Sequence, residues 1–315
     1  MRFARADLKV GLYHSLLDWH HEEYPIDGLH PQRDDEAFKA QHAGRRIDKY
    51  ADFLHGQVRE LLTHYGKIDY LWFDFSYPQE DWGWSKGKGA ADWRSAELER
   101  LVLELQPDII LNDRLDLGRG VRTPEQYQPS QPVTQNGKPV IWEACQTLNG
   151  SWGYDRDNFD YKPPNMLAQM LIDTVSKGGN LLLNVGPTGR GELDGHALSI
   201  LKEIGRWTRR HGRSVYGAGA SVFAPPTDCR YTQNGDRLYL HIFAWPFRHI
   251  HLKGLEGRIR YAQFLHDGSE IKMIEHEGQS AASHIEVAEE AGTVTLELPV
   301  GQPDVLVPVV ELLLK

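Results

Sequence analysis

The sequence predicts an α/β protein in which strands and helices alternate, followed by an antiparallel β-sandwich. Residues 1–214 alternate short, nearly continuous apolar runs with amphipathic segments, a pattern typical of parallel strands buried on both faces by helices. Residues 215–315 contain short segments of alternating apolar and polar residues separated by glycine, Asp-Gly and proline turns. We therefore expect two domains, residues 1–214 and 215–315.

Five apolar runs are predicted to form the parallel strands. They span residues 8–15, 68–75, 108–114, 139–144 and 180–187. Each helix predicted between or after them places its apolar residues on one stripe, and these helices span residues 47–65, 94–105, 166–177 and 194–211. Asp194 is expected to cap the last helix.

The strands of the predicted sandwich are recognised by their alternation and by the turns between them. They span residues 236–245, 249–257, 258–268, 283–292 and 293–301. Residues 86–93 and 128–139 are predicted to be loops because glycine, proline and polar residues predominate there.

Composition narrows the class of protein. The chain has 315 residues with a net charge of −9, which disfavours a nucleic-acid surface, and it lacks the roughly 18 consecutive apolar residues of a membrane span. Two cysteines, Cys145 and Cys229, are too few for a disulfide framework and fit a reducing compartment. Polar residues interrupt the apolar patch near the start, so we expect no signal peptide and a cytoplasmic location.

Polar side chains occur at the carboxyl end of every predicted parallel strand. They are Tyr13, His14, Asp74, Asn112, Asp113, Arg114, Glu143 and Asn184. Ligands of barrels and open α/β sheets bind at the carboxyl ends of the strands, because the loops converge there. The sequence therefore predicts a binding pocket at this end of the sheet.

Aromatic side chains accompany these polar groups. They occur in residues 18–25, 76–87 and 149–156, and also at Trp72 and Trp142. Flat aromatic faces beside carboxylates and amides suit sugars, which stack through C–H faces and hydrogen-bond through hydroxyls. Carboxylates with aromatics at a barrel rim favour glycoside hydrolysis, which needs two carboxyl groups.

The motifs together resemble family 29 of the glycoside hydrolases, the α-L-fucosidases. The resemblance rests, in order, on "GLYHSLLDWHHEEYPID", "IDYLWFDF", "NDR", "TPEQY", "WEACQTLNGSWGY" and "SKGGNLLLNVGPTGRGELD". It implies a (β/α)₈-like catalytic barrel followed by a β-sandwich, and a fucosylated glycan or glycoside as substrate. It also implies a retaining mechanism with a covalent fucosyl-enzyme intermediate.

The resemblance assigns roles to residues at matching positions. Asp74, at the end of "LWFD", matches the family's nucleophile. Tyr13 and Trp72 match positions that line the fucose pocket, and Arg114 matches the arginine of "NDR". His14 and Trp142 are further candidates for contact with the sugar.

The resemblance leaves two candidates for the acid/base. Glu125 in "TPEQY" matches the glutamate of some members, and Glu143 in "WEACQT" matches one proposed in others. We favour Glu125 because a loop residue can move to the leaving oxygen, whereas a residue at a strand end is fixed by its neighbours. A retaining pair lies about 5–5.5 Å apart, and the nucleophile must stay ionised, so donors such as Arg114 are expected beside Asp74.

The predicted strands are fewer than a complete barrel needs. A barrel has eight strands, and five are predicted here, so the family's first three strands have no counterpart, nor do an "HWG"-type segment and paired histidines that contact the sugar. The edge of residues 8–15 would then be open. This predicts a homo-oligomer or another association that covers the edge, or else a truncated form of the sequence. The alternative function is a catalytically impaired fucose-binding or scaffold protein.

A metal site is the remaining alternative. It would use His14, His20, His21 and Glu22, but these lack the i, i+4 histidine spacing of a zinc helix and fall in a loop with proline. Hydrolysis by two carboxyl groups requires no cofactor, so none is expected.

Overall fold

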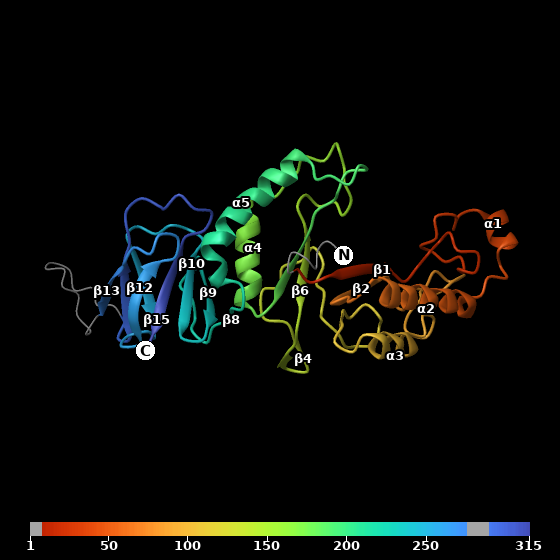
Figure 1. The fold of residues 1–315 in the computed structure, drawn as a ribbon, viewed down its shortest axis with the longest axis horizontal. Helices are drawn as coiled ribbons and strands as arrows, with labels where there is room; N and C mark the ends of the chain where they lie inside the picture. The colour runs from red at the N-terminus through yellow and green to blue at the C-terminus, as the bar shows by residue number, and fades with distance from the viewer. Residues whose placement is uncertain (1–7, 276–289) are drawn as a thin grey trace. The chain divides into compact units, whose positions relative to one another are not determined.

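A computed structural model describes residues 8–275 and 290–315 (Figure 1). The chain forms two compact units, Met1–Thr123 and Pro124–Lys315. The first unit is α/β, and the second contains both α/β elements and antiparallel sheets.

The first unit alternates strands and helices as the sequence predicts. Its elements are β1 (Gly11–Ser15), α1 (Glu36–Gln41), α2 (Ile47–His64), β2 (Tyr70–Asp74), α3 (Ser95–Leu105) and β3 (Ile110–Leu111). The strands form a parallel sheet in the order β1-β2-β3, so that β1 lies at an edge within the described part of the chain. The register places Tyr13 opposite Trp72 and Ser15 opposite Asp74.

One hydrophobic core joins the sheet of the first unit to its helices. The apolar stripe of α2, which includes Leu54 and Val58, packs with Leu98 of α3 and with Leu71 and Phe73 of β2. All five side chains are fully buried. Burying each one contributes about 1.5–3 kcal/mol, and this fixes β2, which ends at Asp74.

A side chain continues the sheet where β3 ends. The Asn112 amide accepts from Phe73 N–H at 3.0 Å and donates to Phe73 C=O at 2.8 Å, so it replaces a peptide group beside β2. Asn112 then forms a bridge with Val121, where Asp113 N–H donates to Val121 C=O at 3.0 Å. The chain between them leaves the sheet and returns to it.

The second unit begins with a hairpin and a parallel pair. Its first elements are β4 (Thr134–Gln135), β5 (Lys138–Pro139), β6 (Glu143–Thr147), α4 (Pro164–Ser176), β7 (Asn180–Asn184), α5 (Gly195–His211) and η2 (Gly212–Ser214). β6 and β7 are parallel, and Asp194 caps α5 by accepting from the His196 and Ala197 amides, as predicted.

One predicted strand has the wrong bounds. Residues 139–144 were expected to form a strand ending near Glu143, but β6 begins at Glu143 and runs to Thr147. The strand starts later than predicted because Lys138 and Pro139 form β5, which pairs with β4 in a hairpin. The turn of this hairpin is formed by Asn136 and Gly137, both with positive φ. Glu143 therefore lies at the amino end of its strand.

Two antiparallel sheets complete the second unit. Their strands are β8 (Gly219–Ala220), β9 (Cys229–Asn234), β10 (Arg237–Ile242), β11 (His249–Lys253), β12 (Ile259–Phe264), β13 (Lys272–Glu275), β14 (Thr293–Glu297) and β15 (Val309–Leu314). The sheet orders are β12-β15-β10-β9-β8 and β11-β14-β13, and side chains of both sheets form one hydrophobic cluster. Four of the five predicted strands are confirmed as β10, β11, β12 and β14, whereas residues 283–292 lie largely outside the described residues.

Helices of the second unit pack directly on its larger antiparallel sheet. Ile172 of α4 and Trp207 of α5 belong to one cluster with Tyr239 of β10 and Val309 of β15. Trp207 Nε1 also donates to Val307 C=O at 2.8 Å. The compact units consequently divide at Thr123, and the division into domains at residue 214 stays a prediction.

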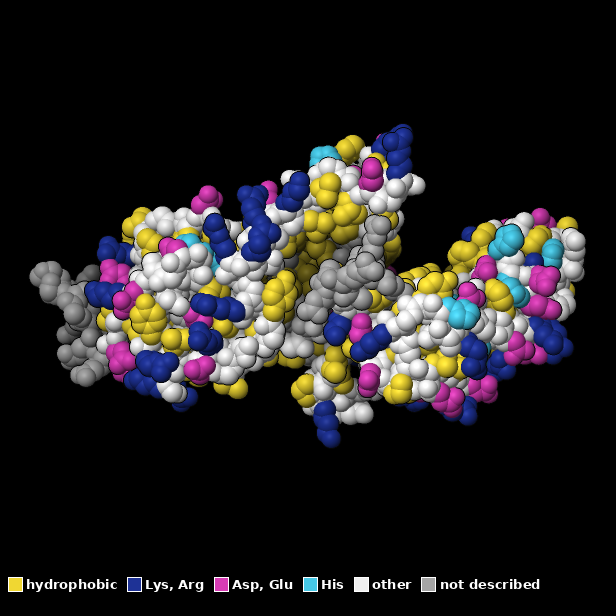
Figure 2. Space-filling view, viewed as in Figure 1, with side chains coloured by type: hydrophobic (Ala, Val, Ile, Leu, Met, Phe, Trp, Pro, Cys, Tyr) yellow, Lys and Arg dark blue, Asp and Glu magenta, His cyan; other side chains and the backbone are white. Residues whose placement is uncertain are grey.

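The surface shown in Figure 2 mixes charges of both signs. Lys and Arg side chains lie among Asp and Glu side chains over the elements of both units. Among residues 8–275 and 290–315, no helix combines the length and apolar composition that crossing a membrane would require.

Candidate active site

Two aromatic rings on neighbouring strands begin the site. Tyr13 of β1 and Trp72 of β2 stack with ring centroids 5.8 Å apart and planes 20° from parallel. Side chains alternate along a strand, so Asp74, two residues after Trp72, lies on the same face of β2. The parallel register therefore brings Tyr13, Trp72 and Asp74 to one surface at the carboxyl ends of both strands.

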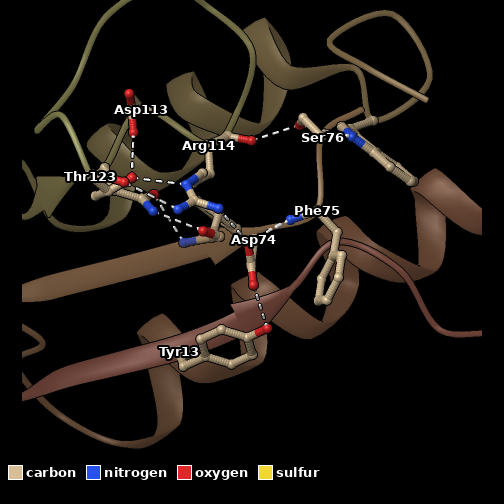
Figure 3. Close-up of polar contacts among 10 residues, drawn as sticks. Tyr13, Asp74, Phe75, Ser76, Asp113, Arg114 and Thr123 are labelled. Carbon is tan, nitrogen blue, oxygen red and sulfur yellow. Dashed lines mark hydrogen bonds and ion pairs between the residues drawn. The ribbon is translucent and has the colours of Figure 1, made fainter. Parts of the chain in front are cut away.

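The Asp74 carboxylate accepts three hydrogen bonds (Figure 3). Tyr13 Oη donates to Oδ2 at 2.9 Å, and Arg114 Nη1 donates to Oδ1 at 3.0 Å. Phe75 N–H donates to Oδ1 at 2.9 Å. The side chain is 17% exposed, so one fixed carboxylate faces solvent between a phenol and a guanidinium.

Arg114 is itself held from two sides. Its Nε donates to Thr123 Oγ1 at 2.8 Å and its Nη2 to Thr123 C=O at 3.2 Å, while the guanidinium lies 5.0 Å from the Trp72 ring centroid. Thr123 Oγ1 donates in turn to Asp113 Oδ1 at 2.8 Å. These contacts aim one edge of the guanidinium at Asp74 (Figure 3).

The backbone turns sharply after Asp74. Phe75 has φ of 74°, in the left-handed region, which points its N–H back to the preceding carboxylate. Such a conformation costs about 1–3 kcal/mol in a residue other than glycine. Ser76 stabilises the turn, because its Oγ donates to Arg114 C=O at 2.6 Å and accepts from Trp93 Nε1 at 3.2 Å.

His14 lies on the opposite face of β1 from Tyr13. Its Nδ1 donates to Ser15 C=O at 2.9 Å, and its ring centroid is 6.0 Å from that of the buried Phe73. Burial lowers the pKa of His14 below its ordinary value. The structure therefore does not bring His14 to the surface formed by Tyr13 and Asp74, because adjacent residues of a strand face opposite sides.

Two further predicted residues are buried in the second unit. Trp142 is 1% exposed and its ring covers Gly179, where a Cβ atom would lie only 2.3 Å from the ring. This packing places Trp142 in the interior, where its ring supports the start of β7. Glu143, the first residue of β6, is 8% exposed.

Glu125 is exposed and follows the junction of the two units. Cys145 of β6 pairs with its segment, since Cys145 N–H donates to Pro124 C=O and Gln126 N–H donates to Cys145 C=O, both at 2.9 Å. The Gln126 amide also donates to Thr147 Oγ1 at 2.9 Å. Glu125 is therefore presented on a loop fixed against β6.

His21, in the loop after β1, packs against aromatic side chains of α2. The His21 ring lies 4.2 Å from the Phe53 ring and 5.3 Å from the Tyr50 ring, measured between centroids. In the described ranges 8–275 and 290–315, His, Cys, Asp and Glu side chains form no group of three or more suited to a metal ion.

Thr123 and Ser76 were not among the predicted site residues. Sequence reasoning missed them because each acts through Arg114. The Thr123 contact also depends on the return of the chain to the sheet at Val121. The run "NDR" was the available signal for Asn112, Asp113 and Arg114.

A comparison with protein families shows which family the chain belongs to. The profile of the family described as "Alpha-L-fucosidase" matches residues 2–213, well over half of the chain. The chain belongs to the α-L-fucosidase family. Its similarity to human tissue α-L-fucosidase is 26% identity over 251 residues, which cover 77% of this chain and 49% of that protein. The chain thus spans about half the length of this curated relative.

Solved structures of α-L-fucosidases share the fold. α-L-fucosidase isoenzyme 1 from Paenibacillus thiaminolyticus is 40% identical with a TM-score of 0.88, covering 99% of this chain and 73% of that one. A family 29 α-L-fucosidase from Bacteroides thetaiotaomicron, trapped as a covalent intermediate, has a TM-score of 0.77 at 22% identity, with 99% of this chain and 69% of that one covered. The second likeness concerns the fold alone.

Proposed function

We propose that this chain hydrolyses α-linked L-fucose from glycans or glycosides with retention of configuration, and that Asp74 is the nucleophile. The observation that supports this most is the Asp74 carboxylate at the end of β2, oriented by Tyr13, Arg114 and the Phe75 amide. Membership of the α-L-fucosidase family supports L-fucose as the sugar that is released. Membership of the family that includes a relative trapped as a covalent intermediate supports the covalent mechanism.

The proposed reaction has two displacements. In the first, an Asp74 oxygen bonds to the anomeric carbon while the bond to the leaving oxygen breaks, and the leaving oxygen takes a proton from the acid. In the second, water gives its proton to the same residue, now a base, and its oxygen displaces Asp74 from the anomeric carbon. The Trp72 face and the Tyr13 ring offer stacking surfaces for the sugar beside the reacting carbon.

Glu125 is the acid/base in this proposal. Its exposure allows contact with a leaving group, whereas Glu143 is buried at the amino end of β6. Ligands of parallel sheets bind at the opposite, carboxyl ends of the strands, which disfavours Glu143. The separation of about 5–5.5 Å between the two carboxyl groups that retention requires stays a prediction.

The nucleophile is tested by chemical rescue. Asp74→Gly should lower kcat on an aryl α-L-fucoside by at least about 1,000-fold, because no covalent intermediate can form. Azide should then restore turnover and yield a fucosyl azide. A folded Asp74→Gly variant that azide does not rescue counts against the nucleophile, and wild-type protein that binds fucose without turnover supports the alternative of an impaired fucose-binding protein.

The acid/base is tested with substrates of different leaving groups. Glu125→Ala should keep kcat/KM on a fucoside whose leaving group needs no proton and lose about 10²–10⁴-fold on one that does. Glu143→Ala should not show this dependence. The opposite result would transfer the role to Glu143.

The proposal also includes a barrel and a β-sandwich as the architecture of the chain. We infer that β1, β2, β3, β6 and β7 are strands of a (β/α)-type barrel, since they are parallel and alternate with helices. The two antiparallel sheets with one shared cluster are inferred to form the β-sandwich. A homo-oligomer that covers the edge of β1 stays a prediction, which the molecular mass in solution at several concentrations would test.

A further inference from the structure

The segment that bears Glu125 is fixed at both of its ends within the second unit. At its start, the backbone pairs with Cys145 of β6, as described above. At its end, Gln128 Nε2 donates to Asp173 Oδ2 at 3.0 Å and to Thr174 Oγ1 at 2.8 Å. Lys177 Nζ donates to Pro129 C=O at 2.8 Å. Helix α4 therefore holds residues 128–129, three and four positions after Glu125.

Asp173 is the centre of these contacts. Its Oδ2 accepts from both Gln128 and Lys177, the latter at 2.5 Å, and its Oδ1 accepts from Arg230 Nε at 2.7 Å. We name Gln128, Asp173, Lys177 and Arg230 the Asp173 cluster. Burial raises the pKa of Asp173, but the hydrogen bonds from Lys177, Arg230 and Gln128 outweigh burial and bring the pKa below its ordinary value.

The cluster joins three parts of the second unit. Gln128 comes from the segment of Glu125, and Arg230 comes from β9 of the larger antiparallel sheet. Asp173 lies in the last turn of α4, and Lys177 is the residue that caps this helix. Arg230 is oriented further, because its Nη1 donates to Cys229 C=O at 2.8 Å and its guanidinium lies 5.2 Å from the Phe243 ring centroid. The Asp173 carboxylate thus links the antiparallel sheet to the segment that bears Glu125.

We infer that Asp173 is a positioning residue that fixes the acid/base Glu125, and that Arg230 and Lys177 hold Asp173 in place. The inference rests on the proposed function and gives β9 a part in the reaction. An ion pair that only joined α4 to β9 would need Arg230 and Asp173 alone. Here the other carboxylate oxygen binds Gln128, so the pair is coupled to the segment of Glu125.

The expected size of the effect follows from the sensitivity of proton transfer to distance. A displacement of about 1 Å far from the reacting atoms can cost about 100-fold in rate. Loosening one end of the segment should leave Cys145 holding the other end, so the loss should be smaller than that caused by removing Glu125 itself.

The test uses Asp173→Asn, with Lys177→Met as a second variant should Asp173→Asn fail to fold. Arg213→Met is the matched control, because Arg213 Nη2 also donates to a buried carboxylate, Glu311, at 2.7 Å in the same unit. Two quantities are measured on the full chain: kcat/KM on fucosides of several leaving groups, and hydrogen exchange of the amides of residues 125–128.

The inference predicts a leaving-group-dependent defect. Asp173→Asn should lose about 10–100-fold in kcat/KM on a substrate that needs protonation and less than about 3-fold on one that does not. Added azide should raise its kcat on the second substrate, because azide attacks without a base. Exchange at residues 125–128 should be at least about 10-fold faster than in wild type, and Arg213→Met should change neither quantity.

Two results would overturn the inference. One is unchanged exchange at residues 125–128 in a folded Asp173→Asn or Lys177→Met variant. The other is a uniform loss of kcat/KM on all leaving groups, which indicates general destabilisation. Failure of the proposed function is a separate outcome, seen as absence of azide rescue in Asp74→Gly while the exchange measurement still reports on the Asp173 cluster.

Discussion

At the scale of single residues, two side chains of different charge donate hydrogen bonds to Asp74. Tyr13 supplies a neutral hydroxyl to one carboxylate oxygen, and Arg114 supplies a charge to the other. In the proposed reaction Asp74 bonds through one oxygen and loses charge, so donors that are fixed in advance would decide which oxygen attacks and how it is aimed.

Tyr13→Phe removes one hydroxyl and keeps the ring stacked on Trp72. We expect kcat/KM on an aryl α-L-fucoside to fall about 10–100-fold, because a hydrogen bond to a charged group contributes about 1.5–3 kcal/mol. Steady-state kinetics measures this change. Tyr65→Phe, at an exposed residue after α2, is the control and should have no effect, and an equal loss in both variants would contradict the role of Tyr13.

Arg114→Lys tests whether the guanidinium fork matters beyond its charge. Lysine retains a cation but cannot contact Thr123 Oγ1, Thr123 C=O and Asp74 together. We expect kcat/KM to fall about 10–100-fold with little change in the midpoint of thermal unfolding. Near wild-type kinetics would show that a point charge beside Asp74 is sufficient.

The sequence was a better guide to the polar groups at the strand ends than to the side chains that hold them. Asp74 and Arg114 follow from polar residues at strand ends, and the structure joins them. Thr123 lies nine residues after Arg114, and nothing in the spacing indicates that a loop will return it to the guanidinium. His14 was grouped with Tyr13 at the end of β1, but adjacent residues of a strand face opposite sides, so the two side chains lie on different faces.

At the scale of elements, periodicity predicted α2, α3, α4 and α5 closely, whereas α1 and several strands of the second unit were not predicted. β15 (Val309–Leu314) was not predicted, because α4 and α5 cover one face of its sheet and the shared cluster covers the other, which removes the alternation. The bounds of β6 were wrong because a short hairpin at residues 134–139 took the place of the expected strand start.

Asn112 links β3 to β2 through two hydrogen bonds, and its substitution tests how much this link stabilises the fold. Asn112→Leu removes both hydrogen bonds and leaves the Phe73 N–H and C=O buried beside an apolar side chain. We expect a loss of about 2–4 kcal/mol in the free energy of unfolding, measured by urea titration. Asn234→Ala, at an exposed position in β9, should change it by less than about 0.5 kcal/mol. A comparable change in the two variants would refute the linking role.

At the scale of the whole molecule, buried histidines make stability depend on pH. Burial lowers the pKa of His211 to about 4 and that of His241 to about 3. His211 Nδ1 donates to Trp207 C=O and His241 donates through Nε2 to Thr232 Oγ1. Among the described residues, the remaining ring nitrogen of each histidine is buried without a hydrogen-bond partner, so protonation is unfavourable in the folded state.

The sign of the pH effect follows from these lowered values. The unfolded chain binds protons at histidine near pH 6.5 and the folded chain does so only near pH 4 and 3, so the stabilisation is complete above about pH 6.5 and is lost as the pH falls toward 4. We expect the urea midpoint to fall steadily between pH 6.5 and 4.5. His211→Gln should reduce this slope, and an unchanged slope would contradict the assignment.

The bridge between Asn112 and Val121 affects how well the protein tolerates insertions in the loop between these residues. The residues between them leave and rejoin the sheet at neighbouring points, and the exposed tip includes Asp116 and Gly118, both with positive φ. Added residues at this tip need not move either end. The excursion is therefore a permissive insertion site a few residues from Arg114, and insertions there should leave the ladder beside β2 intact.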